Sequence, residues 1–212
     1  MNFLRLLTIS FVILLILGCA EKKPEILKEF YAEDVHDFIK KMQNYQSIES
    51  SLAIDYESKG NLLSGDALLK INKNETLLRI YYIGFPAGEV YQKDEEVSST
   101  LPIEKDKVKQ ILTGVRKGFM WWVGDFEINE KDNNFILKEK NSDREVMLNK
   151  KGFIPVSQSF TFENQQILIT YDNFKEFQTE DKTSLVMPSR IIVYYKNRTL
   201  TINIEKLKLI NG

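Results

Sequence analysis

The spacing of apolar residues changes along the chain, and each spacing predicts a different element. Over residues 26–45, apolar side chains recur every three or four positions. This spacing predicts one amphipathic helix of about 20 residues that covers a sheet. Over residues 48–100 the period falls to two, and turn sequences such as NKNE separate the runs. Alternation between tight turns predicts an antiparallel meander that curls toward a barrel.

The middle of the chain interrupts this alternation. Residues 108–112 have helical spacing, which predicts a second helix that ends at Gly114. Residues 119–123 are all apolar, and so short a run has to be buried by the rest of the protein. From residue 125 the alternation resumes. The pattern predicts one mainly β domain with α: a single curved antiparallel sheet of about 10–11 strands, forming an unclosed half-barrel with an N-terminal helix and a short central helical plug or lid.

The first residues carry a different signal. Arg5 precedes an uncharged, mainly apolar run over 6–17, which Gly18 and Cys19 close. Such a run after one positive charge is typical of a secretory signal peptide. It is shorter than the roughly 20 apolar residues that a membrane-spanning helix needs. An uncleaved membrane anchor is the alternative interpretation. The sequence ILGC resembles a bacterial lipobox, which implies cleavage before Cys19, a diacylglycerol on its thiol and acylation of its new amine.

The lipobox resemblance divides the chain into a signal peptide over 1–18, a lipidated cysteine with a tether over 19–24, and a folded domain over 25–212. Cys19 is the sole cysteine, so it forms no disulfide within the chain. Three acyl chains of the palmitate type, at about 0.8 kcal/mol per buried methylene, hold a protein on a membrane essentially permanently. The Asp that favours inner-membrane retention does not follow the cysteine, which implies the periplasmic face of the outer membrane.

Composition and charge argue against several classes of protein. The chain has 29 Lys and Arg against 30 Asp and Glu, so no basic surface indicates a nucleic-acid partner. His36 is the only histidine and lies on the polar side of the predicted helix, as a solvated side chain does. A metal site built on His and Cys lacks its ligands, and the sequence has no nucleophile elbow, phosphate loop or dinucleotide motif. We therefore expect no enzyme, no metal and no cofactor apart from the lipid on Cys19.

Four segments follow one another in a suggestive order. They are the lipobox with its tether and helix, ETLLRIYYIGFPAGEVYQ, LTGVRKGFMWWVGDF and MPSRIIVYYKNRTLTINIEKLKLI. Together they resemble the LolA/LolB-like family of lipoprotein carriers and receptors, over most of residues 19–210. The resemblance implies an unclosed barrel with helices across its opening, whose apolar cavity takes up the acyl chains of lipoproteins from a periplasmic LolA-like carrier. The receptor branch, LolB, implies insertion of those lipoproteins into the outer membrane.

The segment IYYIGFPAGEVY, residues 80–91, has an uncharged turn where a polar one is expected. The resemblance implies that Phe85, with Pro86 beside it, forms a protruding turn that contacts the membrane and helps release the cargo. The family usually has Pro before the apolar residue and Gly after it, whereas here Gly84 precedes Phe85 and Pro86 follows, so the turn geometry differs. An exposed aromatic ring is favoured at a lipid interface. The alternative is that Phe85 folds back into the core, as most large aromatic side chains do.

The resemblance also implies an acyl-chain cavity. Its candidate lining residues are Leu52, Ile54, Leu78, Ile80, Tyr82 and Trp121. Inward positions of a hollow and of a filled barrel are both apolar, so core packing of these residues stays open. Two other functions fit the same pattern. One is a structural or interaction lipoprotein of the cell envelope that holds no lipid, and the other is a carrier of another lipid class.

Overall fold

A single antiparallel sheet forms the body of the molecule. The structure, a computed structural model, describes residues 28–94 and 96–212. Neighbouring strands follow the order β6-β5-β4-β3-β2-β13-β12-β11-β10-β9-β8-β7. Their bounds are β2 (Tyr45–Ser58), β3 (Asn61–Ile71), β4 (Glu75–Tyr82), β5 (Phe85–Lys93), β6 (Glu96–Ser99), β7 (Phe126–Lys131), β8 (Asn134–Glu139), β9 (Glu145–Asn149), β10 (Pro155–Phe162), β11 (Gln165–Gln178), β12 (Thr183–Tyr195) and β13 (Arg198–Asn211).

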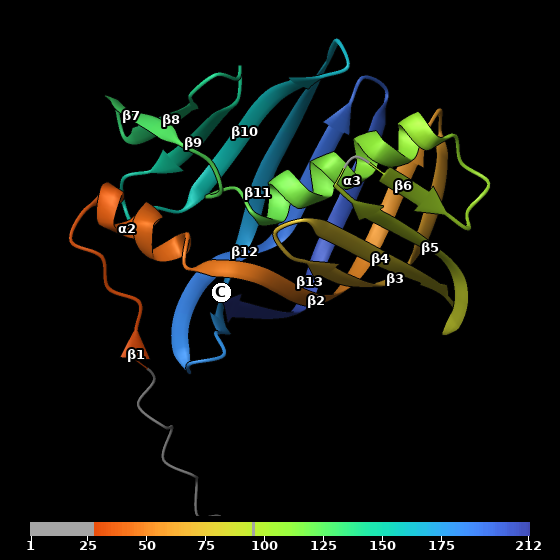
Figure 1. Ribbon diagram of the computed structural model, residues 1–212, viewed down its shortest axis with the longest axis horizontal. Coiled ribbons are helices and arrows are strands. Elements are labelled where there is room, and N and C mark those ends of the chain that lie inside the picture. Colours follow the sequence, from red (N-terminus) through yellow and green to blue (C-terminus); the bar gives the residue numbers. More distant parts are fainter. Residues whose placement is uncertain (1–27, 95) are drawn as a thin grey trace, which may run out of the picture.

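The sheet curls without closing (Figure 1). Its end strands, β6 and β7, are not paired with each other in the described part of the chain. The prediction of an unclosed half-barrel is therefore confirmed. With the two-residue β1 (Lys28–Glu29), which pairs in parallel with the start of β12, the described residues form a 13-stranded sheet, somewhat more than the sequence pattern indicated.

Tight turns join most neighbouring strands. The φ angles are 53° and 80° at Lys59 and Gly60, and 48° and 60° at Glu163 and Asn164. Two central residues with positive φ make a type I′ turn, whose twist matches that of the strands on either side. This turn chemistry, together with the apolar alternation, explains why the hairpins are predicted well from the sequence.

The N-terminal helix is much shorter than predicted. Helix α2 (Val35–Met42) has eight residues, and the chain before it runs extended. Two contacts explain the difference: the Asp34 carboxylate caps the helix by accepting from the amide of Asp37, and the amide of Phe30 donates to the carbonyl of Ser184 on β12. The start of the predicted helix, residues 26–27, lies outside the described residues. His36 is exposed.

Helix α3 (Lys105–Phe119) lies across the concave face of the half-barrel (Figure 1). The prediction that it ends at Gly114 is wrong, because the helix continues for five more residues. Gly114 is buried against β12, and a side chain there would clash with the Tyr195 hydroxyl and Val193. Tyr195 in turn donates to the carbonyl of Gln110 at 3.0 Å. The glycine thus serves close packing rather than helix termination.

The apolar run after α3 is buried as predicted, apart from its last residue. Phe119, Met120, Trp121 and Trp122 belong to the core, whereas Val123 is 46% exposed. The core as a whole is built from residues between Val35 and Leu209. The chain from Ala20 onward therefore contains all of the described core residues.

Gly114→Ala is expected to lower the free energy of unfolding by about 1–3 kcal/mol, because the added methyl group overlaps Tyr195. We expect this loss of stability although alanine is a better helix former than glycine. Gly118→Ala is the matched control, because its added Cβ would lie 3.3 Å from Ile191, and we expect a smaller change. Urea unfolding of the chain from Ala20, followed by circular dichroism, measures both. Equal changes in the free energy of unfolding would mean that Gly114 is not packed more closely against its neighbours than Gly118 is.

Candidate functional site

The hairpin of β4 and β5 ends in three large side chains that stand in water. Tyr82, Ile83 and Phe85 are 62%, 76% and 75% exposed. Tyr82 and Phe85 are directly opposite each other across the strands, so they share one face, and Ile83 occupies the turn with Gly84. We call these three residues the apolar hairpin end. Phe85 does not fold back into the core.

The turn itself differs from the predicted one. Phe85 and Pro86 are the first residues of β5, and both are exposed, but the connection consists of Ile83 and Gly84. Their φ angles are 51° and 77°, as in a type I′ turn. Such turns favour Asn or Asp at the first position. The sequence points to the same hairpin but places Phe85, rather than Ile83, at its tip.

Ile83 is costly in two ways. Among the described residues it is the only β-branched one with positive φ, a conformation that costs an L-residue about 1–2 kcal/mol. It is also the most exposed of the large apolar side chains. Strain and exposure together at one position indicate a functional constraint, since folding alone favours neither.

The neighbouring hairpin adds two more exposed apolar residues. Leu62 and Leu63, at the start of β3, are 63% and 68% exposed. Leu63 is opposite Tyr56 and Leu62 is opposite Glu57, so the two leucines lie on opposite faces of the sheet. Sequence reasoning passed over them, although two adjacent leucines in a strand already imply that one points outward.

The structure brings four of the six candidate cavity residues together. Leu52 and Leu78 are buried in the core, and Ile54 and Ile80 pack against it. The register aligns Leu52, Ala67 and Ile80 in one row across β2, β3 and β4. The other two candidates lie apart from this group: Tyr82 at the apolar hairpin end, and Trp121, 1% exposed, beside helix α2.

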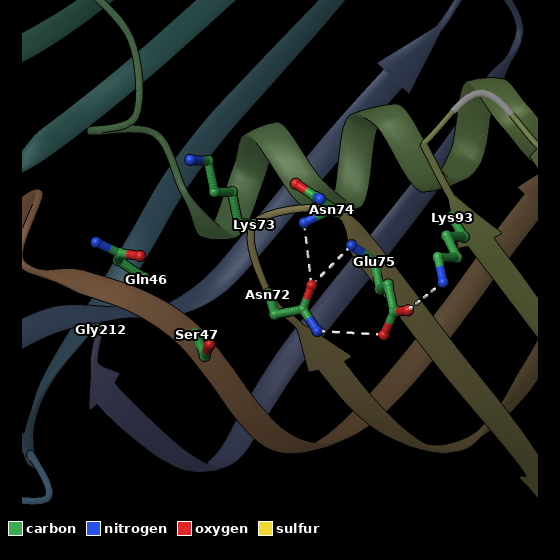
Figure 2. Close-up of a pocket in the computed structure, with 8 residues that line it drawn as sticks. All are labelled: Gln46, Ser47, Asn72, Lys73, Asn74, Glu75, Lys93 and Gly212. Carbon is green, nitrogen blue, oxygen red and sulfur yellow. Dashed lines mark hydrogen bonds and ion pairs between the residues drawn. The ribbon is translucent and has the colours of Figure 1, made fainter.

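Two hollows of the described surface are formed by mainly polar residues. One of about 390 Å³, shown in Figure 2, is lined by Gln46, Ser47, Asn72, Lys73, Asn74, Glu75, Lys93 and Gly212. The other, of about 450 Å³, is lined by Ala53, Asn173, Phe174, Lys175, Ser189, Asn203, Ile204 and Glu205. Neither includes a candidate cavity residue. The concave side is instead covered by α3 and by residues 120–123, which we call the tryptophan segment.

Arg116 ties α3 to the turn between β3 and β4. Its guanidinium donates to the carbonyls of Asn72 at 2.6 Å and Glu75 at 3.0 Å, to the hydroxyl of Thr76, and to the carbonyl of Lys73. Burial lowers the pKa of Arg116. These partners are neutral acceptors, so the contact fixes position rather than neutralising charge.

Arg144 holds the segment after α3 in place through hydrogen bonds to its backbone. This side chain is 2% exposed and donates to the carbonyls of Trp121 and Val123, each at 2.8 Å. Its Nε donates to the Gln158 side chain at 2.9 Å, and Glu139 is 3.5 Å away. Backbone carbonyls after the end of a helix lack intrahelical hydrogen-bond donors, and here the Arg144 guanidinium is the donor.

Gln158 and Tyr171 complete this network beneath the helix end. The Gln158 amide donates to the carbonyl of Lys117 at 2.7 Å and contacts the Tyr171 hydroxyl, which donates to the carbonyl of Gly118 at 3.1 Å. Burial raises the pKa of Tyr171. The buried polar groups therefore anchor the cover of the half-barrel and do not converge on an open cleft.

Two negative observations complete the survey of residues 28–94 and 96–212. They contain no group of three or more His, Cys, Asp or Glu side chains placed to hold a metal ion. None of their helices has the length and apolar character required to cross a membrane. Cys19 lies outside the described residues.

Known proteins resemble this chain in fold rather than in sequence. No family model and no curated protein matches it. A LolA superfamily protein from Nitrosomonas europaea superposes with a TM-score of 0.51 at 12% identity, covering 85% of this chain and 96% of that one. A putative outer membrane lipoprotein-sorting protein domain from Vibrio parahaemolyticus gives 0.52 at 11% identity, covering 84% and 91%. The chain has the LolA-like fold. This agrees with the expected half-barrel and says nothing of the LolB branch.

Ile83→Asn is expected to raise the free energy of unfolding by about 0.5–1 kcal/mol, because Asn tolerates positive φ and the exposed isoleucine loses little packing. Lys59→Asn, at the same position of the neighbouring type I′ turn, is the control, and its free energy of unfolding should rise less. Urea unfolding of both variants measures the difference. A destabilised Ile83→Asn variant would mean that Ile83 packs against the fold.

Proposed function

We propose that this protein is a lipid-anchored, non-catalytic receptor of the cell envelope that holds the acyl chains of lipoproteins and helps insert them into the outer membrane, as a LolB-type receptor does. The observation that carries the proposal is the apolar hairpin end, where Ile83 is both strained and exposed. The LolA-like fold supports it. The anchor is a diacylglycerol and an N-acyl chain on Cys19, and the domain faces the periplasm.

The apolar hairpin end supplies the contact with the membrane. Burying a side chain such as Ile83 or Phe85 in an apolar phase stabilises by roughly 1.5–3 kcal/mol. Tyr82 adds a ring with a hydroxyl, a combination that settles at the headgroup level. A lipid anchor on Cys19 keeps the domain at the surface, so a contact this modest is sufficient for repeated insertion.

The concave side supplies the acyl-chain site. The group of Leu52, Ile54, Leu78 and Ile80 presents apolar surface from β2 and β4 beneath the cover. When α3 moves outward, an acyl chain delivered by a periplasmic LolA-like carrier takes its place on this surface. Transfer from a small protein site to the bilayer is downhill for an acyl chain, since the bilayer buries it completely, and so it requires no nucleotide.

A second candidate function rests on the filled concave side. Because α3 and the tryptophan segment are tightly held by Arg116 and Arg144, the same fold also suits a structural or interaction lipoprotein of the envelope that takes up no lipid. A third candidate is a carrier of another lipid class, which would use the same concave site for a different ligand. Identification of a bound ligand distinguishes these functions.

Native mass spectrometry of the chain from Ala20, incubated with a triacylated lipopeptide, tests the receptor function. We expect an adduct of the mass of one lipopeptide, because the concave side accepts its acyl chains. Incubation with a phospholipid in a parallel sample distinguishes a carrier of another lipid class. A protein that keeps its free mass with both ligands would favour the structural lipoprotein.

Phe85→Ser is expected to weaken binding of the chain from Ala20 to phospholipid vesicles by roughly 10-fold or more, because about 1.5–3 kcal/mol of interfacial burial is lost. Leu168→Ser is the matched control, since Leu168 is also exposed but belongs to β11. Vesicle flotation at several lipid concentrations measures both. Equal losses would rule out a special role for the apolar hairpin end.

A further inference from the structure

The indole N–H of Trp121 has no hydrogen-bond partner. The side chain is 1% exposed, and its Nε1 is one of the few buried side-chain polar atoms of the described residues without an acceptor. The adjacent Trp122 is equally buried, yet its Nε1 donates to the carbonyl of Tyr45 at 3.4 Å. An unpaired buried donor costs roughly 1–3 kcal/mol, and each such group requires an explanation.

Aromatic rings pack against the Trp121 side chain and against one another. Phe38 of α2 stacks on Trp121 with ring centroids 6.0 Å apart and an interplanar angle of 16°. Phe30 meets Phe38 edge-on at 5.5 Å, and Phe153 lies 5.3 Å from Phe38 and 5.9 Å from Phe135. We call these five residues the aromatic cluster. It is an apolar environment in which the Trp121 N–H is an isolated donor.

The aromatic cluster contains a second costly feature. Phe153 has a φ of 52°, a conformation that a bulky side chain rarely adopts. It precedes Ile154 and β10 in the connection from β9, and its ring contacts hold it against α2. A strained backbone and an unpaired donor in one cluster are what a binding site shows when its ligand is absent.

The cover over Trp121 is small. Helix α2 has eight residues, fewer than the roughly 12–15 that make an isolated helix even marginally stable. Its C-terminal tie is Gln43, whose side chain donates to the carbonyl of Gly124 at 2.9 Å and of Trp122 at 3.3 Å. Because α2 is not part of the sheet, an outward movement of α2 would break no strand pair, although it would uncover its buried face of Val35, Phe38, Ile39 and Met42.

We propose that the aromatic cluster is an acyl-binding site in which the Trp121 N–H donates to the ester or amide carbonyl of the acyl chain. The inference rests on the proposed function, which makes an acylated molecule the ligand. The acyl chain takes the place of the Phe38 ring, and its carbonyl group reaches past the edge of the indole, where the oxygen accepts from Nε1 in the plane of the ring. Arg144 holds the Trp121 carbonyl at 2.8 Å, so the backbone that carries the donor stays in place. An apolar site with one placed polar group is typical of ligand pockets.

Two lipids that differ only in the carbonyl test this role. The chain from Ala20 is titrated with ester-linked and ether-linked phosphatidylcholine of the same short chain length, below their critical micelle concentrations. We expect the ester lipid to bind roughly 3- to 10-fold more tightly, the equivalent of one hydrogen bond. Trp121→Phe should abolish this preference. Trp122→Phe, the matched control, removes the paired indole N–H and should leave the preference unchanged.

The indole resonances of the unchanged protein test the same point without a substitution. We expect the Trp121 N–H signal in nitrogen-15 NMR to shift downfield with the ester lipid and not with the ether lipid. Equal affinity for the two lipids, or a preference that survives Trp121→Phe, would overturn the inference alone. Binding of neither lipid, and of no lipopeptide, would overturn the proposed function as well.

Discussion

The concave face of the sheet is apolar, and because the sheet does not close, another part of the chain has to cover it. A closed barrel fills its interior from every side, whereas this half-barrel depends on α3 and the tryptophan segment. Gly114 lets the helix approach β12 closely, and two arginines fix both the helix and the segment that follows it. Arg116 and Arg144 bind mainly backbone carbonyls. Arg116 of the cover thus reaches main-chain carbonyls of the β3–β4 turn, and Arg144, just before β9, reaches main-chain carbonyls of the segment after α3.

The same cover lies over the apolar interior. Every strand of the main sheet is paired with its neighbours, so neither α3 nor α2 contributes to the hydrogen-bond ladder. A movement of either helix would therefore break no strand pair. Outward movement of α3 exposes Leu52 and Ile80 on the concave side, and movement of α2 exposes Trp121. A fold of this kind keeps a rigid frame and places its adaptable parts on the open side, as ligand uptake requires.

The sequence predicts the frame better than the cover. Strands and hairpins follow from alternation and turn chemistry, both of which are local. The N-terminal helix was predicted too long because residues before Asp34 have helical spacing, while their extended path depends on pairing with Ser184, about 150 positions away. From local sequence, Gly114 looks like a helix end; its role follows from a contact with Tyr195, about 80 positions away. For the candidate site, the apolar turn was visible in the sequence, but whether Phe85 points outward and whether Ile83 has positive φ depend on backbone geometry.

Two sites among the described residues each combine a strained backbone with a second unfavourable feature. At the apolar hairpin end, Ile83 is strained and exposed, and in the aromatic cluster, Trp121 has an unpaired donor next to a strained Phe153. A lipid reduces the cost at each site by a different property. Its hydrocarbon accepts the exposed side chains, and its carbonyl accepts the hydrogen bond. Chance or local packing would explain an unfavourable feature at a single site. Here there are two such sites, and a lipid would relieve one with its hydrocarbon and the other with its carbonyl group. One class of ligand thus accounts for both, and this favours a lipid-handling protein over a structural one.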